Sequence, residues 1–306
     1  MKDTVLILGA TGRLGRNAAT AFENGGWEVR RFDRKTDNLW DAAWGANVIV
    51  NGWNMAYTKW ATEIPGLTQQ VIEVAQASGA TVIIPGNVYV YGEATSQRMS
   101  TDTPHAATNP LGRIRIEMEQ AYRDAGVKTI ILRAGDYIDT HASGNWFDLI
   151  MAKSVSKGVF TYPGETDIPH AFAYLPDVAT AMVALANRKD TLGVFEDIGF
   201  PGFTLSGEDF GRAIRDTLDR PIKVKQMAWW PLILASPFWA EGHKLIEMRY
   251  LWDTPHRIDA TRFEELVPGF NATQVTDALS VALSDLVENK VHPNKPMATG
   301  GASFTA

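Results

Sequence analysis

Two kinds of hydrophobic pattern alternate along most of this chain. Short runs of consecutive apolar residues, such as Val5–Leu8, are typical of strands buried on both faces of a sheet. Longer stretches, such as residues 66–78, repeat apolar positions at helical spacing. The patterns predict strands at 5–8, 27–32, 46–51, 81–85, 128–134 and 193–199, and helices at 13–24, 66–78, 110–125, 176–186 and 206–218. This alternation predicts an α/β fold of the Rossmann type, a doubly wound parallel sheet with right-handed crossovers.

The pattern becomes less regular after Gly135. We expect a helix at 145–157, a loop at 161–169 and mainly helical structure in the remaining chain to about residue 288. The predicted division is a Rossmann domain of residues 1–140 plus about 170–200, a smaller and mainly helical C-terminal lobe of about 141–169 and 201–288, and a loose tail of 289–306. The tail is expected because it contains Pro, Asn, Gly, Ser and Thr with little apolar content.

A glycine-rich loop lies between the first predicted strand and the first predicted helix, with the sequence GATGRLG from Gly9 to Gly15. Glycine allows a tight turn, close approach of the backbone to a pyrophosphate, and close packing of helix on strand. The helix N-terminus then faces the anion. This context favours a dinucleotide site over an ordinary loop. The predicted cofactor contacts in this loop are Gly9, Thr11, Gly12, Arg13, Leu14 and Gly15.

Two opposite charges, Asp33 and Arg34, follow the second predicted strand. An acidic residue about twenty positions after the glycines bonds the adenosine ribose hydroxyls and favours NAD, whereas an arginine accepts the 2′-phosphate of NADP. The alternative is that both are solvated charges in a turn. The cofactor is therefore expected to be NADP or NAD, with a slight preference for NADP because of Arg34.

Composition narrows the classes of protein. The chain has 306 residues, 45% of them hydrophobic, and a net charge of −6, so we expect no nucleic-acid partner and no anionic membrane partner. It has no cysteine, which excludes disulfides and thiol catalysis. The six histidines have no metal-binding spacing, so no metal site is expected. Neither a signal peptide nor a membrane-spanning run is evident, and we expect a soluble, cytoplasmic protein.

The loop sequence GATGRLG resembles the nucleotide loop of extended or atypical short-chain dehydrogenase/reductases, which include sugar-nucleotide epimerases and NmrA-like proteins. The third predicted strand ends at Asn51, where these relatives have a small-residue turn beside the cofactor. The resemblance therefore adds Asn51 to the expected cofactor contacts. It implies an enzyme that transfers a hydride, or a protein that binds NAD(P) without turning it over.

The catalytic positions of that family are changed in this chain. Family members have a Ser/Thr before a VYG sequence, and a YxxxK pair on the next helix. Alignment on Val90-Tyr91-Gly92 places Asn87 at the Ser/Thr, and the segment NPLGRIR places Leu111 at the tyrosine and Arg115 at the lysine. Leucine cannot transfer a proton, and arginine stays protonated. The usual mechanism cannot operate, although Arg115 can hold a ribose or phosphate and Asn87 can orient a carbonyl.

Tyr89 is the candidate replacement for the missing tyrosine. Asn87, Tyr89 and Tyr91 are spaced by two, so in an extended strand they would point to one side. If that side faces the nicotinamide, Tyr89 donates the proton and Tyr91 is structural. The alternative is that Tyr89 only packs or stacks on the substrate.

Four further residues are predicted to contact the substrate. The segment RAGD resembles the family's RxxN and places Asp136 where an asparagine meets the substrate; a carboxylate there acts as a base, binds a hydroxyl or caps a helix. His170 replaces an arginine that often contacts the phosphate of a sugar nucleotide. It is a polar wall or an acid–base group. Asn145 and Trp146 are pocket candidates by position alone.

Residues 226–252 are rich in Trp, Leu, Ile, Met and Phe, and Pro231 and Pro237 divide them into short helices that cannot span a membrane. They form core, a homodimer face, or an apolar substrate cleft. The sequence thus predicts an NAD(P)-dependent oxidoreductase or epimerase-like enzyme for a small carbonyl or hydroxyl compound. A non-catalytic NAD(P)-sensing protein of the NmrA-like kind is the alternative, and a non-redox isomerase or lyase stays open.

Overall fold

The computed structural model describes residues 2–93 and 95–288 of the chain. Six parallel strands form the main sheet, in the order β10-β6-β4-β3-β1-β2. These strands are β1 Thr4–Leu8, β2 Glu28–Phe32, β3 Val48–Asn51, β4 Thr81–Gly86, β6 Thr129–Arg133 and β10 Phe195–Gly199. The strand order reverses between β1 and β3, which places a topological switch point at the carboxyl end of β1. The predicted doubly wound parallel sheet is confirmed.

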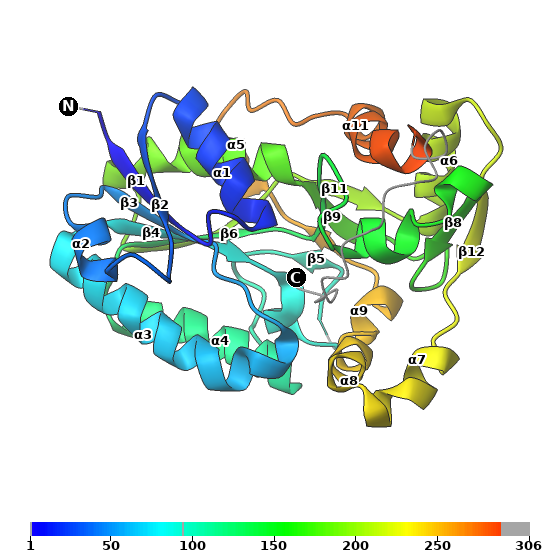
Figure 1. Cartoon of the computed structure of the whole chain (residues 1–306), viewed down its shortest axis with the longest axis horizontal. Coiled ribbons are helices and arrows are strands. Elements are labelled where there is room, and N and C mark those ends of the chain that lie inside the picture. The colour runs from blue at the N-terminus through cyan, green and yellow to red at the C-terminus, as the bar shows by residue number, and fades with distance from the viewer. Residues whose placement is uncertain (1, 94, 289–306) are drawn as a thin grey trace.

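Helices cover both faces of this sheet (Figure 1). Helices α1 (Arg13–Asn24) and α5 (Leu175–Ala186) pack together on one face, and α3 (Trp60–Ser78) and α4 (Pro110–Asp124) pack together on the other. A short helix, α2 (Leu39–Ala43), lies beside α3. Alternate residues of β1 enter the two cores, which explains why its sequence is apolar throughout.

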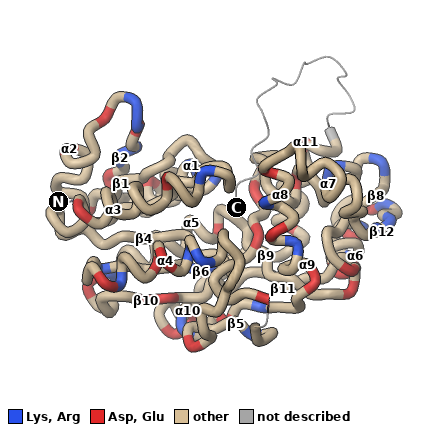
Figure 2. Tube along the Cα trace, turned by 90° about the horizontal axis from the view of Figure 1, so that it is seen from below, with Lys and Arg blue, Asp and Glu red and all other residues tan. Residues whose placement is uncertain are grey.

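Small sheets and short helices make up the rest of the described chain. The strands are β7 Asp136–Ile138, β9 His170–Tyr174 and β11 Phe203–Leu205 in one sheet, with the pairs β8 Val159–Tyr162 with β12 Lys223–Gln226, and β5 Arg98–Met99 with β13 Arg257–Ile258. The helices are α6 Gly207–Leu218, α7 Trp230–Ala235, α8 Ala240–Glu247, α9 Tyr250–Asp253, α10 Thr261–Leu266 and α11 Val275–Glu288. Acidic and basic residues are interspersed over most of the trace (Figure 2).

Three sequence-based expectations about elements were wrong. Helix α3 begins at Trp60 instead of residue 66, because Trp60 is buried and its indole N–H donates to Met55 O. Residues 145–157 form a π-helix at Phe147–Met151 and a 3-10 turn at Val155–Lys157, which ends at Gly158 with φ of +75°. The chain after α6 is not all helical, because the edge of β8 pairs with β12.

The helix predicted at 206–218 is confirmed as α6, and it begins with a side-chain cap. Ser206 and Asp209 form the reciprocal capping box, in which each side chain accepts from the other residue's backbone N–H. The expected loose tail, residues 289–306, lies outside the described residues. Within the described part of the chain, no helix combines the length and the apolar character needed to cross a bilayer. The predicted division into a Rossmann domain and a smaller lobe stays a prediction.

Candidate active site

A cavity of about 650 Å³ lies at the carboxyl ends of the central strands. Open α/β sheets bind ligands at this edge, next to the switch point. The segments that line the cavity follow five strands of the chain: residues 9–14 after β1, 33–35 after β2, 52–54 after β3, 87–89 after β4 and 134–137 after β6. Further lining comes from Trp60, Arg115, Asn145 and Trp146. The volume is that of a site for a small molecule or cofactor.

The glycine loop is closed to any side chain at two positions. Gly9 has φ of +73°, and a Cβ on it would lie 2.6 Å from Gly52 O. A Cβ on Gly15 would lie 2.1 Å from Gly9 O, so helix α1 can pack this closely on β1 only with glycine there. Gly12 is the N-cap of α1 and supplies no capping side chain. Amides of the first helical turn are therefore left for an anion, and the loop fits the diphosphate of a dinucleotide.

Eight of the ten predicted cofactor contacts line the cavity: Gly9, Thr11, Gly12, Arg13, Leu14, Asp33, Arg34 and Arg115. The other two lie elsewhere. Gly15 lies behind the loop, where it sets the packing of α1 on β1. Asn51 lines a separate cavity of about 30 Å³, and its amide donates to the Tyr122 hydroxyl at 3.2 Å.

Charged side chains crowd the end of the cavity beside β2. The Asp33 carboxylate accepts the backbone N–H of Lys35 at 2.9 Å. The Arg34 guanidinium lies 5.7 Å from the centre of the Trp53 ring, and no ion pair of Arg34 is found among the described residues. Arg31, by contrast, pairs with Glu23. This end of the cavity therefore offers both a carboxylate for ribose hydroxyls and a cation held on an aromatic face.

The expected extended strand through Asn87, Tyr89 and Tyr91 was wrong. Residues Val88–Tyr91 form a 3-10 turn, because the Asn87 side chain accepts the backbone N–H of Tyr89 at 3.1 Å and caps it. Asn87 and Tyr89 line the cavity, but Tyr91 does not. The Tyr91 ring instead lies 5.4 Å from the Arg133 guanidinium, and its hydroxyl donates to Ser100 O.

Tyr89 shares a hydrogen bond with a second buried tyrosine that the sequence analysis did not single out. The hydroxyls of Tyr57 and Tyr89 are 2.7 Å apart. Burial raises the pKa of both phenols, that of Tyr89 well above its ordinary value of 10. Tyr89 is therefore a neutral phenol at neutral pH, able to take part in hydrogen bonds but unsuited to act as a phenolate base.

The family's tyrosine–lysine pair has no equivalent here. Leu111 is fully buried and does not line the cavity. Arg115 does line it: its guanidinium donates to Pro85 O at 2.7 Å and lies 5.9 Å from the centre of the Trp60 ring. Burial lowers the pKa of Arg115, and the described residues supply no carboxylate to pair with it. A cation in this position suits an anionic or hydroxyl-rich group of a ligand.

Asp136 faces the cavity, and His170 lies behind it. The Asp136 carboxylate is 2.7 Å from His170 Nε2, while His170 itself is 1% exposed and does not line the cavity. The imidazole is stacked on Trp252, with ring centres 4.2 Å apart. Burial and the neighbouring His170 lower the pKa of His256 to about 3, so this second imidazole stays neutral. The contact with His170 therefore holds the Asp136 carboxylate at the cavity wall.

Asn145 and Trp146 both line the cavity, as expected. The Asp148 carboxylate accepts the backbone N–H groups of Gly144 and Asn145, each at 2.8 Å, and so fixes the turn that carries them. Arg13 donates to Gly144 O at 2.9 Å and ties this turn to the start of α1. The turn therefore closes the cavity over the glycine loop.

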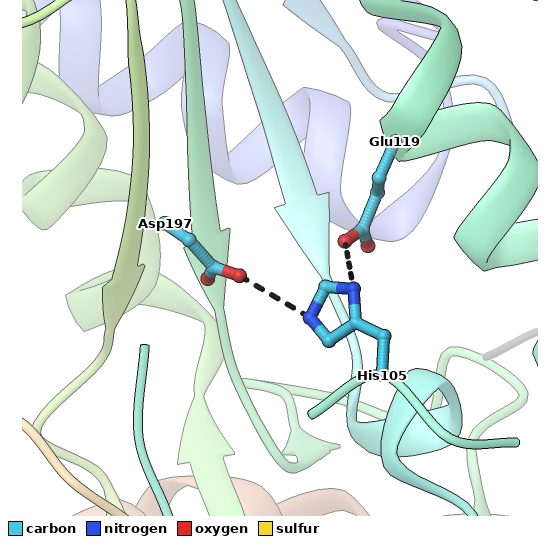
Figure 3. Close-up of side chains that lie close together, drawn as sticks. All are labelled: His105, Glu119 and Asp197. Atoms are coloured by element: carbon cyan, nitrogen blue, oxygen red, sulfur yellow. Dashed lines mark ion pairs between the residues drawn. The ribbon is translucent and has the colours of Figure 1, made fainter. Parts of the chain in front are cut away.

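A buried ion network holds the turn that follows Asn87, through a hydrogen bond to the Asn87 carbonyl. Arg133 donates to Asn87 O at 2.6 Å and pairs with Glu119 at 2.8 Å and Asp197 at 2.5 Å. Burial opposes ionisation of Asp197, but the Arg133 charge lowers the pKa of that carboxyl to about 2. His105 lies between the two carboxylates, 3.9 Å from Glu119 and 3.6 Å from Asp197 (Figure 3). No sequence motif indicates this cluster, because its members are far apart along the chain.

The solved structures that resemble this chain include MoeE5 and two UDP-sugar 4-epimerases. MoeE5 in complex with UDP-glucose and NAD matches with a TM-score of 0.70 and 16% identity, over 95% of this chain and 100% of that one. UDP-glucuronic acid 4-epimerase from Bacillus cereus, in complex with UDP-glucuronic acid and NAD, gives 0.70 and 15% over 94% and 100%. The UDP-Glc/GlcNAc 4-epimerase from the human pathogen Campylobacter jejuni gives 0.64 and 15% over 92% and 98%.

These matches show the fold alone, a Rossmann-type sheet with a C-terminal part, as in these epimerase structures. The expected resemblance to extended short-chain dehydrogenase/reductases is confirmed at the level of the fold. No protein-family model matches the sequence, and no curated protein matches it.

Proposed function

We propose that this protein is an NAD(P)-dependent oxidoreductase or epimerase-like enzyme with atypical catalytic residues. One observation carries the proposal: a single cavity runs from the glycine loop at Gly9–Leu14 to Tyr89 and Asp136. A dinucleotide with its diphosphate on the loop would reach these two side chains with its nicotinamide end. The nicotinamide, when bound, supplies or accepts a hydride.

At the end of the cavity away from the glycine loop, which we call the inner end, one side chain donates a proton and another accepts one. Tyr89 is held neutral by burial and donates to a substrate oxygen, while Asp136 accepts the proton of a substrate hydroxyl. The Asn87 side-chain oxygen is used in capping the turn, which leaves its amide N–H groups to orient a carbonyl. Arg115 would bind the ribose or a phosphate in place of the missing lysine.

The substrate we propose is a small carbonyl or hydroxyl compound with apolar character. Trp60, Tyr137 and Trp146 give the cavity aromatic walls, and His170 is too deep to act as a phosphate-binding side chain. The slight preference for NADP rests on Arg34, although the neighbours are complexes with NAD. A cytoplasmic location and a homodimer remain predictions from the sequence.

The test measures nicotinamide absorbance with a panel of carbonyl and hydroxyl compounds. We expect turnover by the wild-type protein, and a loss of about a hundredfold in kcat for Tyr89→Phe and for Asp136→Asn. Tyr91→Phe is the matched control, because its hydroxyl lies outside the cavity. Full turnover by Tyr89→Phe would remove Tyr89 from its role.

The buried Leu111 at the position of the usual tyrosine favours a second candidate, a sensor of the NmrA-like kind that binds NAD(P) without reaction. It predicts cofactor binding, measured by calorimetry, with no change of absorbance for any compound in the panel. A non-redox isomerase or lyase would convert substrate without net change in the cofactor, which product analysis detects.

A further inference from the structure

Residues 228–240, which we name the apolar arm, connect β12 to α8 and contain no charged side chain. The arm comprises helix α7 and the 3-10 turn at Ser236–Phe238. Apart from Ser236 and the tryptophan indoles, all of its side chains are hydrocarbon. A run of this kind is ordinary in a buried element, but this one lies at the surface.

Large apolar side chains of the arm stand in solvent. The exposed fractions are 65% for Trp230, 45% for Ile233, 68% for Leu234 and 95% for Phe238. The first three are spaced as neighbours on one helical face, and Phe238 follows four residues later. The opposite side is anchored: Trp229 is buried, and its indole N–H donates to Pro163 O at 2.7 Å. An unpartnered apolar face that is held in place marks an interaction site.

Part of the arm's backbone is hydrogen-bonded within the arm. Ile233 N–H donates to Trp229 O, and Ser236 N–H donates to Leu232 O. Pro231 and Pro237 have no N–H to expose at the start of each helical turn. The arm therefore presents few free polar groups, which is the condition for entering the boundary between lipid headgroups and acyl chains.

Basic side chains adjoin the arm. Lys223 and Lys225 are exposed on β12, which leads directly into it, and Lys153 and Lys157 are exposed just before β8, the partner strand of β12. The ion pairs found among the described residues include none of these four lysines. Figure 2 shows Lys and Arg at this end of the molecule. These four lysines therefore give this side of β8 and β12 positive groups without an ion pair among the described residues, although the chain's net charge is −6 and the neighbouring α6 also carries acidic residues.

We propose that the apolar arm docks the protein peripherally on an anionic lipid surface. Trp230, Leu234 and Phe238 enter the headgroup–acyl boundary, and the lysines of β12 contact the headgroups. A protein partner fits the arm less well, because protein interfaces form about one hydrogen bond per 100–200 Å² and the arm has almost no side chains for them. This revises the expectation from net charge, which averages over the whole surface.

The full chain is tested by co-sedimentation with vesicles of phosphatidylcholine, and of phosphatidylcholine with phosphatidylglycerol. We expect binding to the mixed vesicles that weakens with salt. The variant Leu234→Ser/Phe238→Ser should bind at least about tenfold more weakly. Lys223→Glu/Lys225→Glu should lose a similar factor on the anionic vesicles only. Trp44→Ser is the matched control, since Trp44 is 76% exposed but lies at the end of α2, the short helix beside α3.

The thermal midpoint of each variant checks that it is folded. We expect midpoints close to that of the wild type, because all of the substituted side chains are exposed. Absence of wild-type binding to both vesicles would overturn the proposal, as would equal weakening by Trp44→Ser. Analytical ultracentrifugation measures the oligomeric state and so tests the alternative that the arm binds a second copy of the chain. A wild-type dimer that Leu234→Ser/Phe238→Ser converts to monomer would assign the arm to a second copy of the chain instead.

Discussion

The two ends of the cavity differ in the kind of atoms that determine their shape. At the glycine loop the shape is set by main-chain atoms, because Gly9 and Gly15 leave no room for a Cβ. At the inner end it is set by side chains: Asn87 caps the turn that carries Tyr89, and Arg133 holds that turn from below. A backbone-built site depends on local residue types, whereas a side-chain-built site depends on partners far away in the sequence.

The side-chain-built end should be the more fragile in stability. Arg133→Met leaves the buried carboxylates of Glu119 and Asp197 without their cation and should cost about 3–5 kcal/mol in the free energy of unfolding. Denaturant unfolding measures this loss. Arg113→Met is the control, because it removes an exposed pair with Glu117 that contributes at most about 1 kcal/mol. Equal effects of the two variants would contradict the proposed role of the network.

At the backbone-built end, a substitution should lower stability and cofactor binding by disturbing the packing of α1 on β1. Gly15→Ala places a methyl group 2.1 Å from Gly9 O, so we expect a loss of about 3 kcal/mol and loss of cofactor binding. Gly66→Ala is the control, since Gly66 lies in helix α3 with nothing within 4 Å of its Cβ position. That variant should gain about 0.5–1 kcal/mol. Calorimetry and denaturant unfolding together check both results, and a tolerated Gly15→Ala would disprove the close packing.

The residues behind Asp136 should show a pH dependence. The folded-state pKa of His256 is about 3, against about 6.5 for an unfolded chain. As pH falls below about 6.5, the unfolded chain binds a proton that the folded chain does not, so His256 lowers stability by up to about 1.4 kcal/mol per pH unit. His256→Asn should lack this component. Unfolding curves between pH 7 and 4, at about unit steps, should therefore fall less steeply for the variant, and parallel curves would refute the buried neutral imidazole.

Substitutions of Asp33 and Arg34, which follow β2 at the cavity, should give the smallest effect, a change in the preference between NAD(H) and NADP(H). Arg34→Ala should weaken NADPH binding about tenfold and leave NADH binding unchanged. Asp33→Asn should do the reverse, weakening NADH through its ribose hydroxyls. Titration calorimetry with both cofactors checks the pair. Equal changes for the two cofactors would show that neither side chain discriminates the 2′-phosphate.

The same contrast explains what the sequence could predict. The strand Val5–Leu8, the glycine loop that follows it and the helix at 206–218 are encoded by neighbouring residues, and each was placed correctly. The 3-10 turn at Val88–Tyr91 was predicted as a strand, because a spacing of two cannot show that Asn87 caps its own chain. Tyr57 was missed because its partner Tyr89 is 32 residues away.

Contacts between residues far apart in the sequence also determine whether a given side chain reaches the cavity or lies behind its wall. His170 was expected at the substrate, but the stacking on Trp252 places it behind Asp136. Asn51 is the last residue of β3 as expected, yet its amide donates to the Tyr122 hydroxyl of α4. Periodicity identified the strand ends that approach the cavity; it did not identify which side chain on each would face it.

The most direct test of the account is a thermal-shift titration of the wild-type protein with NAD, NADH, NADP and NADPH. A ligand that binds the native state must raise the melting temperature, by the equivalent of about 2.7 kcal/mol at a hundred times its dissociation constant. We predict such a rise for at least one of these cofactors, and its loss in Gly15→Ala. An unchanged melting temperature with all four would contradict the assignment of the glycine loop as a dinucleotide site.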